Sequence, residues 1–190
     1  VNNDKSEDKW LIFVTSKDAG KKLQQEFKDH DIDSAFIMSG TNNEETKSII
    51  DSGQFHCKVL ISTKVLDNGV NIKDISVKNL VVCAYDKTTF IQEIGRVRIN
   101  IKNPRKINLF IKAMNKKIFL GRKKSVYKPK LDDVELFEKD FDKFKLHYNM
   151  DLNQVYPDIF YLNEKNEWKI NTTGYARLLK DNDFALNIIE

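Results

Sequence analysis

The chain has 190 residues, of which 41% are hydrophobic and 32% are charged, and its net charge at pH 7 is +4. This much apolar material can build a core, which excludes a disordered chain. No apolar run approaches the roughly 18 residues of a membrane-spanning helix, and no apolar signal core opens the sequence. The two cysteines lack metal-ligand spacing and indicate buried thiols in a reducing cytosol, so we expect a cytoplasmic protein.

Positive charge is concentrated in one stretch. Residues 96–130 contain 13 lysines and arginines and no acidic residue, whereas the rest of the chain holds 19 basic residues against 28 acidic ones. So uneven a distribution favours contact with a polyanion such as nucleic acid or a nucleotide. The alternative is that these side chains only decorate solvent-exposed faces.

Apolar runs separated by turn residues predict alternating strands and helices. Residues 1–9 are polar and are predicted to be a linker. The first domain is predicted over residues 10–112, with helices after Ser16 or Asp18, through 47–50 and after the fourth strand. Its strands are predicted at 10–14, 35–38, 59–61, 80–84 and 107–111. This alternation predicts an α/β fold with a parallel sheet, helices on both faces, and ligands at the carboxyl ends of the strands.

The pattern changes after residue 112. Residues 113–130 are predicted to be an exposed basic connector, and 131–190 an accessory α-rich segment. Within that segment we expect one helix over 131–148, a hairpin joining 159–162 to 168–170, and two short helices in the last 20 or so residues. The helix carries an apolar stripe more typical of a core than of a partner-binding face: Val134, Phe137, Phe141, Phe144 and Tyr148.

Three stretches carry a recognisable pattern, namely Trp10–Ser16, Lys58–Ile72 and Thr89–Arg98, the last read as a short helix. In order and spacing they resemble motifs IV, V and VI of the superfamily 2 (DEAD/DEAH-like) helicases. Motif VI of that family is Q-x-x-G-R-x-x-R, and this chain departs from it at Ile99, where the second arginine belongs. The positions that match are Gln92, Gly95 and Arg96. The resemblance implies a C-terminal RecA-like domain followed by an accessory segment.

The resemblance also implies that the chain forms one side of an ATP site between two domains. Arg96 would contact the triphosphate, and Arg98 is hypothesised to replace the arginine finger missing at Ile99. Asn71 stands where aspartate is frequent in the family, and Gly69 would let the backbone approach a phosphate. The residues assigned to ATP are Arg96 and Arg98 as catalytic residues, and Gln92, Gly95, Asn71 and Gly69 as binding residues.

Nucleic-acid contacts are implied at the loops that follow the first three strands. Thr63 resembles the family threonine that bonds a nucleic-acid phosphate, and Ser16, Ser39 and Gly40 resemble the other backbone contacts. Phosphate contacts carry no sequence information, so binding to DNA or RNA should be sequence-tolerant and sensitive to salt.

The sequence has no G-x-x-x-x-G-K-[ST] phosphate loop and no strand-end carboxylate pair, and its three histidines lack metal-ligand spacing. We therefore expect this chain alone not to hydrolyse ATP. An N-terminal RecA-like domain before Val1 would supply most of the contacts to ATP and Mg²⁺.

The predicted function is the C-terminal half of an ATP-dependent helicase or translocase. One alternative is a non-catalytic nucleic-acid-binding α/β module, which the displaced arginine favours. Another is a flavodoxin-like binding domain, which the alternation of strands and helices alone permits.

Overall fold

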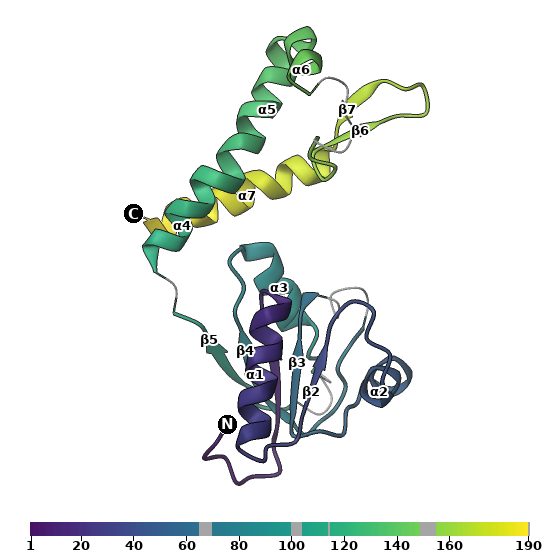
Figure 1. The fold of residues 1–190 in the computed structure, drawn as a ribbon, viewed down its shortest axis with the longest axis vertical. Helices are drawn as coiled ribbons and strands as arrows, with labels where there is room; N and C mark the ends of the chain where they lie inside the picture. Colours follow the sequence, from purple (N-terminus) through teal and green to yellow (C-terminus); the bar gives the residue numbers. More distant parts are fainter. Residues whose placement is uncertain (65–69, 100–103, 114, 149–154, 190) are drawn as a thin grey trace. The chain divides into compact units, whose positions relative to one another are not determined.

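The structure is a computed structural model of the chain. It describes residues 1–64, 70–99, 104–113, 115–148 and 155–189. These form two compact units, Val1–Ala113 and Met114–Glu190 (Figure 1). In the described ranges, no helix has both the length and the apolar character required to cross a membrane.

The first unit is built on a parallel sheet in which the strands lie in the order β2-β3-β1-β4-β5. The strands are β1 (Lys9–Phe13), β2 (Ser34–Ile37), β3 (Val59–Ser62), β4 (Val77–Val82) and β5 (Asn108–Ile111). The connecting helices are α1 (Lys17–Asp29), α2 (Glu44–Ser52) and α3 (Lys87–Gly95). The predicted α/β architecture with a parallel sheet is confirmed.

Side chains of β1 alternate between two apolar clusters, one on each face of the sheet. Leu11 and Phe13 pack with Ile49 of α2 and with apolar residues of α3. Ile12 packs with Phe27 of α1 on the other face. Figure 1 shows α1 in front of the sheet and α3 behind it. Because both faces of the central strands are covered, their sequences are continuous apolar runs.

The edge strand β5 is the exception to this burial. All four of its residues are exposed, although the ring of Phe110 stacks on that of Trp10 with 5.2 Å between the ring centroids. Among the described strands β5 pairs with β4 alone, so one long side of β5 is hydrogen-bonded within the sheet. An apolar run predicts a strand but does not show that the strand lies at an edge.

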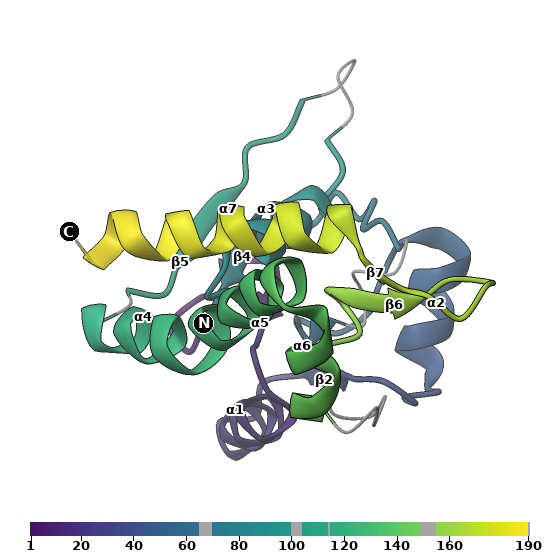
Figure 2. The same cartoon turned by 90° about the horizontal axis from the view of Figure 1, so that it is seen from above.

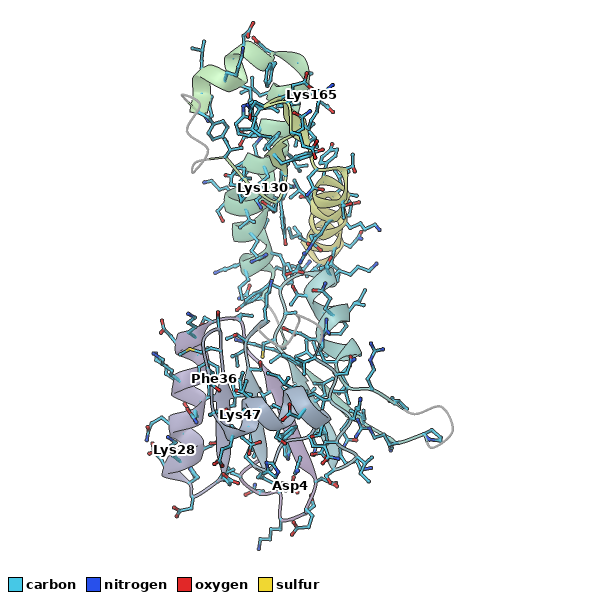
Figure 3. The ribbon with its side chains drawn as sticks, turned by 90° about the vertical axis from the view of Figure 1, so that its right-hand side faces the viewer. Asp4, Lys28, Phe36, Lys47, Lys130 and Lys165 are labelled. Atoms are coloured by element: carbon cyan, nitrogen blue, oxygen red, sulfur yellow. The ribbon has the colours of Figure 1, made fainter. Side chains whose placement is uncertain are left out.

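Local signals set the ends of the helices. Ser16, rather than Asp18, caps α1, and its Oγ accepts a hydrogen bond from the amide of Ala19 at 3.1 Å. A Cβ on Gly20 would overlap the ring of Phe36, which Figure 3 labels on the neighbouring strand. Gly20 therefore permits the close packing of α1 on β2. Gly53 ends α2 in the left-handed conformation, at φ +74°.

The N-terminal residues are not the linker that we expected. Trp10 donates from Nε1 to Asp4 at 2.6 Å, and Lys58 lies 3.4 Å from the same carboxylate. Hydrogen bonds from Ser6 and Trp10 hold the pKa of Asp4 far below its usual range. β1 moreover begins at Lys9, within the predicted linker. The polar composition of this segment did not indicate its contacts with the sheet.

A buried carboxylate precedes β4 and gives a pH-dependent prediction. Asp74 is 5% exposed and accepts hydrogen bonds from Lys9 Nζ and the Ser76 amide, both at 2.9 Å. Burial alone would raise the pKa of Asp74, but the bonds from Lys9 and Ser76 outweigh it and lower that pKa. Because the folded pKa is below the unfolded one, the carboxylate stabilises the fold above about pH 4 and loses this effect as the pH falls.

We expect Asp74→Asn to lower the free energy of unfolding by about 1–3 kcal/mol at pH 7, and by less at pH 3. Urea unfolding of both proteins at the two pH values measures this difference. Asp51→Asn, at an exposed position of α2, is the matched control. An equal loss at both pH values would contradict the charge-based account.

The second unit is mostly helical, with one antiparallel hairpin. The elements are α4 (Lys116–Arg122), the π-helical segment η2 (Lys123–Tyr127), α5 (Lys128–Lys139), α6 (Phe141–Tyr148), β6 (Phe160–Leu162), β7 (Trp168–Ile170) and α7 (Thr172–Ile189). The hairpin is confirmed, with Leu162 paired to Trp168. Figure 2 shows α7 running beside α4, and α7 also packs on η2.

The predicted basic connector at 113–130 is wrong, because most of it is helical. Phe119 and Tyr127 are buried in the core of the unit, while the lysines between them face solvent. The wider π turn of η2 directly precedes α5. Pro129, near the start of α5, has no amide N–H and cannot donate an ordinary helical hydrogen bond. Dense positive charge obscured the two apolar anchors of this helix.

Two further helix predictions are corrected. The expected helix over 131–148 is interrupted at Asp140, whose carboxylate accepts a hydrogen bond from the Lys143 amide and so begins α6. The two short helices expected at the end are a single helix, α7. No proline or glycine interrupts it after Gly174.

The core of the second unit is aromatic. Phe144 is 1% exposed and contacts the rings of Phe137, Phe160 and Trp168 at centroid distances of 5.1, 4.9 and 6.2 Å. The predicted apolar stripe therefore packs inward, except that Phe141 remains 38% exposed.

Candidate functional site

One group of predicted residues lies at the carboxyl edge of the sheet. β2, β3 and β1 are adjacent and parallel, so the loops that follow them meet at the same edge. The predicted nucleic-acid contacts on these loops are Ser39 and Gly40 after β2, Thr63 after β3, and Ser16 after β1. The structure thus brings these four residues to one edge.

The loops at this edge differ in the free space and the hydrogen-bond donors that are available to a phosphate. Gly40 has φ +85°, and a Cβ there would have no heavy atom within 4 Å, so the turn has open space around it. The Ser16 oxygen is engaged in capping α1, while its hydroxyl keeps a donor. The Thr63 amide is engaged with the carbonyl of Ile37 at 3.2 Å, and its side chain is half-buried.

A second group of predicted residues lies at the C-terminal end of α3. Asp86 caps this helix directly after β4, with its carboxylate accepting from the Thr89 amide at 2.8 Å. The helix then runs back along the sheet and ends at Gly95, with Arg96 as its C-cap. The two arginines therefore follow the helix and are not on it, which corrects the expected helix over 89–98.

The two segments predicted to surround ATP are bonded to each other. Ile72 forms a parallel bridge with Val97: its amide donates to the Arg96 carbonyl at 2.7 Å, and its carbonyl accepts from the Arg98 amide at 3.0 Å. Arg98 Nε donates to Asn71 Oδ1 at 2.8 Å. Asn71, Arg96 and Arg98 are therefore adjacent in space, although 25 or more residues separate Asn71 from the arginines.

Three further residues were predicted to bind ATP: Gln92, Gly95 and Gly69. Gln92 is exposed on α3, one turn before Arg96. Arg96 itself donates a hydrogen bond from Nη1 to the Val70 carbonyl at 3.4 Å. Gly95 is exposed, and a Cβ there would have no heavy atom within 4 Å. Gly69 lies outside the described residues.

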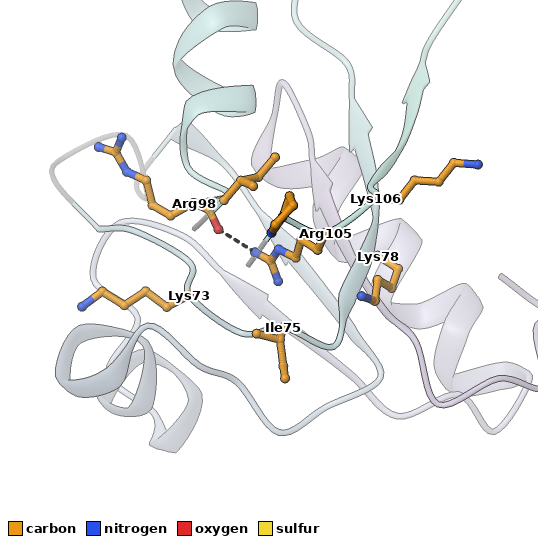
Figure 4. A pocket seen from close by; sticks show the side chains of 8 residues that line it. Lys73, Ile75, Lys78, Arg98, Arg105 and Lys106 are labelled. Carbon is orange, nitrogen blue, oxygen red and sulfur yellow. Dashed lines mark hydrogen bonds between the residues drawn. The ribbon is translucent and has the colours of Figure 1, made fainter. Parts of the chain in front are cut away.

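Arg105 contributes to this region and was missed by sequence reasoning. Its guanidinium donates to the backbone carbonyls of Asp74 and of Arg98, the latter at 3.0 Å (Figure 4). Burial lowers the pKa of Arg105, although the nearby Asp74 carboxylate acts in the opposite direction. The density of lysine and arginine was the only sequence signal. The pairing of β4 with β5 is what brings the start of β5 beside Arg98.

Within the described ranges, no three histidine, cysteine, aspartate or glutamate side chains are grouped so that they could hold a metal ion. Burial, with the charges of Glu45 and Asp33, raises the pKa of Cys57 to about 12. This thiol therefore stays protonated at neutral pH.

The sequence of residues 1–100 matches the family described as the helicase conserved C-terminal domain. The match covers more than half of the chain, which therefore belongs to this family. No curated protein sequence matches the chain.

Solved structures of helicase domains are similar to the first unit. The Saccharomyces cerevisiae Dbp5 L327V complex with RNA and ADP-BeF3 is 25% identical, covering 60% of this chain and 30% of that one, with a TM-score of 0.45. The C-terminal domain of the DEAD-box protein Dbp5 is 21% identical, covering 57% and 63%, with a TM-score of 0.44. The C-terminal part of the Fun30 ATPase domain is 16% identical, covering 55% and 34%, with a TM-score of 0.45. The chain thus spans less than two thirds of each of these proteins.

Proposed function

We propose that the chain is the C-terminal half of an ATP-dependent nucleic-acid helicase or translocase. In this proposal Arg96 and Arg98 act on the phosphates of ATP in a cleft against a second domain. The loops at the carboxyl edge hold the phosphate backbone of DNA or RNA. Membership of the helicase C-terminal domain family supports the general assignment.

The observation that carries the proposal is the bonding between residues 70–72 and 96–98. Asn71 Oδ1 accepts a hydrogen bond from Arg98 Nε, and the Arg98 side chain is exposed. An arginine fixed at Nε can present its terminal nitrogens to a phosphate oxygen. In this proposal the side-chain amide of Asn71 orients Arg98. We give the same role to the aspartate that is frequent at this position in the family.

The proposal divides the chemistry between two domains. This chain contributes positive charge, which stabilises the phosphoryl group as it is transferred. The phosphate loop and Mg²⁺ ligands would come from the N-terminal domain. Gln92 would lie at the margin of the cleft, and Gly69 and Gly95 would leave room for the nucleotide.

The proposal is tested by the ATPase activity of the protein carrying its preceding domain, with and without single-stranded DNA or RNA. Turnover stimulated by nucleic acid supports a motor. Binding of nucleic acid without turnover would instead favour a non-catalytic binding module. The exposed Ile99 at the usual finger position is what keeps that second function under consideration.

Thr63→Val gives a separate test of the carboxyl edge. It keeps the shape of the side chain but removes one hydrogen bond to a phosphate, so we expect binding of single-stranded nucleic acid to weaken about 2- to 12-fold. Fluorescence anisotropy with a labelled oligonucleotide measures the affinity. Thr173→Val, at an exposed position of α7, is the control. Unchanged affinity would remove Thr63 from the proposed interface.

A further inference from the structure

A row of lysines lies on the helical stretch 116–130 near the start of the second unit. This stretch comprises α4, η2 and the first residues of α5, and it holds seven lysines and arginines but no acidic residue. Phe119 is buried in the core of the unit, where its ring centroid lies 6.2 Å from that of Phe184 on α7. Successive residues of a helix are about 100° apart, so Lys117 and Lys124 lie on the side opposite Phe119. With the neighbouring Lys123 they form what we call the lysine row.

The charges of the lysine row are not compensated within the described part of the chain. Lys117, Lys123 and Lys124 are exposed, and none of them has an acidic side chain of the described residues within ion-pair distance. Further along, Lys128 pairs with Asp132 at 2.9 Å, so the uncompensated surface ends near the start of α5. Exposed lysines without counter-charges favour a partner that carries many negative charges.

The helix backbone is bare between Lys117 and Lys124. Gly121 is exposed, and a Cβ there would meet no heavy atom of the described chain within 4 Å, so internal packing does not account for the glycine. A glycine within a helix costs about 1 kcal/mol relative to alanine, but it lets a phosphate approach the backbone closely. The π turn of η2 follows α4 directly, and such turns are frequent at functional sites. Both features favour contact with a partner on this side of the helix.

The aromatic residues of this stretch distinguish between two kinds of nucleic acid. Proteins that bind a single strand combine positive charge with exposed rings on which the bases stack. Phe119 and Tyr127, the two aromatic residues of 116–130, are only 2% and 3% exposed. The lysine row therefore offers charge without a stacking surface. This favours a duplex, whose bases are already stacked and whose strands together present one phosphate per roughly 1.7 Å of axis.

We propose that the lysine row binds the phosphate backbone of duplex nucleic acid. Lys117 and Lys124 are about 10.5 Å apart along the helix, a length over which a duplex presents several phosphates. The inference goes beyond the proposed function, which assigns a nucleic-acid strand to the carboxyl edge of the first unit. It concerns a separate surface in the second unit, outside the residues 1–100 that match the helicase family.

The test is the binding of a labelled duplex to the 190-residue chain, measured by fluorescence anisotropy at several salt concentrations. Lys117→Gln/Lys124→Gln should weaken binding at least about tenfold near 0.1 M salt. It should also lower the slope of log affinity against log salt by about 2, because each lost phosphate contact removes about one released counterion. Lys143→Gln/Lys165→Gln makes the same change in net charge at exposed positions elsewhere in the second unit and should leave affinity unchanged.

Three results would overturn the proposal. They are no measurable binding of the duplex, an equal loss of affinity in the two lysine pairs, and an equal loss for the duplex and for a single strand of the same length in Lys117→Gln/Lys124→Gln. The second would show diffuse attraction to positive charge, and the third would make the lysine row part of a single-strand path.

The outcome is distinguishable from failure of the proposed function. The assay contains no ATP, so the absence of duplex binding would leave the proposed motor untouched. Thr63→Val should weaken binding of the single strand at the carboxyl edge whether or not a duplex binds to the lysine row.

Discussion

Replacing Arg96 by alanine is expected to lower ATP hydrolysis stimulated by nucleic acid by about 10³-fold or more, in a protein that includes the proposed N-terminal domain. Arg96 caps α3, and its Nη1 bond to the Val70 carbonyl ties it to the segment that holds Asn71. Loss of its charge removes stabilisation of the transferred phosphoryl group. Steady-state turnover at saturating ATP measures the effect.

The control for Arg96→Ala is Lys22→Ala, which removes one exposed positive charge from α1. Its turnover should equal that of the unaltered protein. Circular dichroism should show that both variants are folded, since Arg96 also bonds within the fold. If Arg96→Ala were folded and turned over ATP at the normal rate, the assignment of this arginine to the nucleotide would be wrong.

Gly174→Ala is expected to destabilise the second unit by about 3 kcal/mol or more. Gly174 lies in the first turn of α7, where its amide donates to Asn171 Oδ1 at 3.1 Å. A Cβ at this position would overlap the backbone carbonyl of Asp158, which cannot rotate away as a side chain could. For a unit of this size the loss is a large part of the total free energy of unfolding.

The chain offers a matched control and a local probe for Gly174→Ala. A Cβ on Gly121, in α4, would have no heavy atom within 4 Å, so Gly121→Ala should be neutral or stabilising. Trp10 and Trp168 lie in different units, so fluorescence of Trp10→Phe variants reports on the second unit alone. Equal urea midpoints for the two alanine variants would show that the close approach is not required.

The sheet of the first unit could be predicted because its inner strands are buried on both faces. Continuous apolar runs such as Val59–Ile61 leave little ambiguity between a strand and a loop. The exposure of β5 could not be predicted in this way, because an edge strand has the same apolar composition. The helix at 116–139 was hidden for the opposite reason: lysines surround its two buried aromatic residues.

The sequence predicted which residues form the candidate site, but it did not predict how they are arranged in space. A match to Q-x-x-G-R identifies Arg96, but a sequence pattern does not show that α3 ends at Gly95. The bond between Asn71 and Arg98 joins residues 27 positions apart, and it depends on the bridge between Ile72 and Val97. The contribution of Arg105 depends on the pairing of β4 with β5, which local periodicity does not encode.

The most direct test of the account is the ATP turnover of Arg98→Ala, stimulated by single-stranded nucleic acid, in a protein that includes the proposed N-terminal domain. If Arg98 fills the position left vacant by Ile99, turnover should fall by about 10³-fold or more. Affinity for nucleic acid should stay unchanged, because the proposed contacts with that strand lie at the opposite edge of the sheet. Turnover within twofold of the unaltered protein, with normal nucleic-acid binding, would contradict the claim that Arg98 serves as the arginine finger.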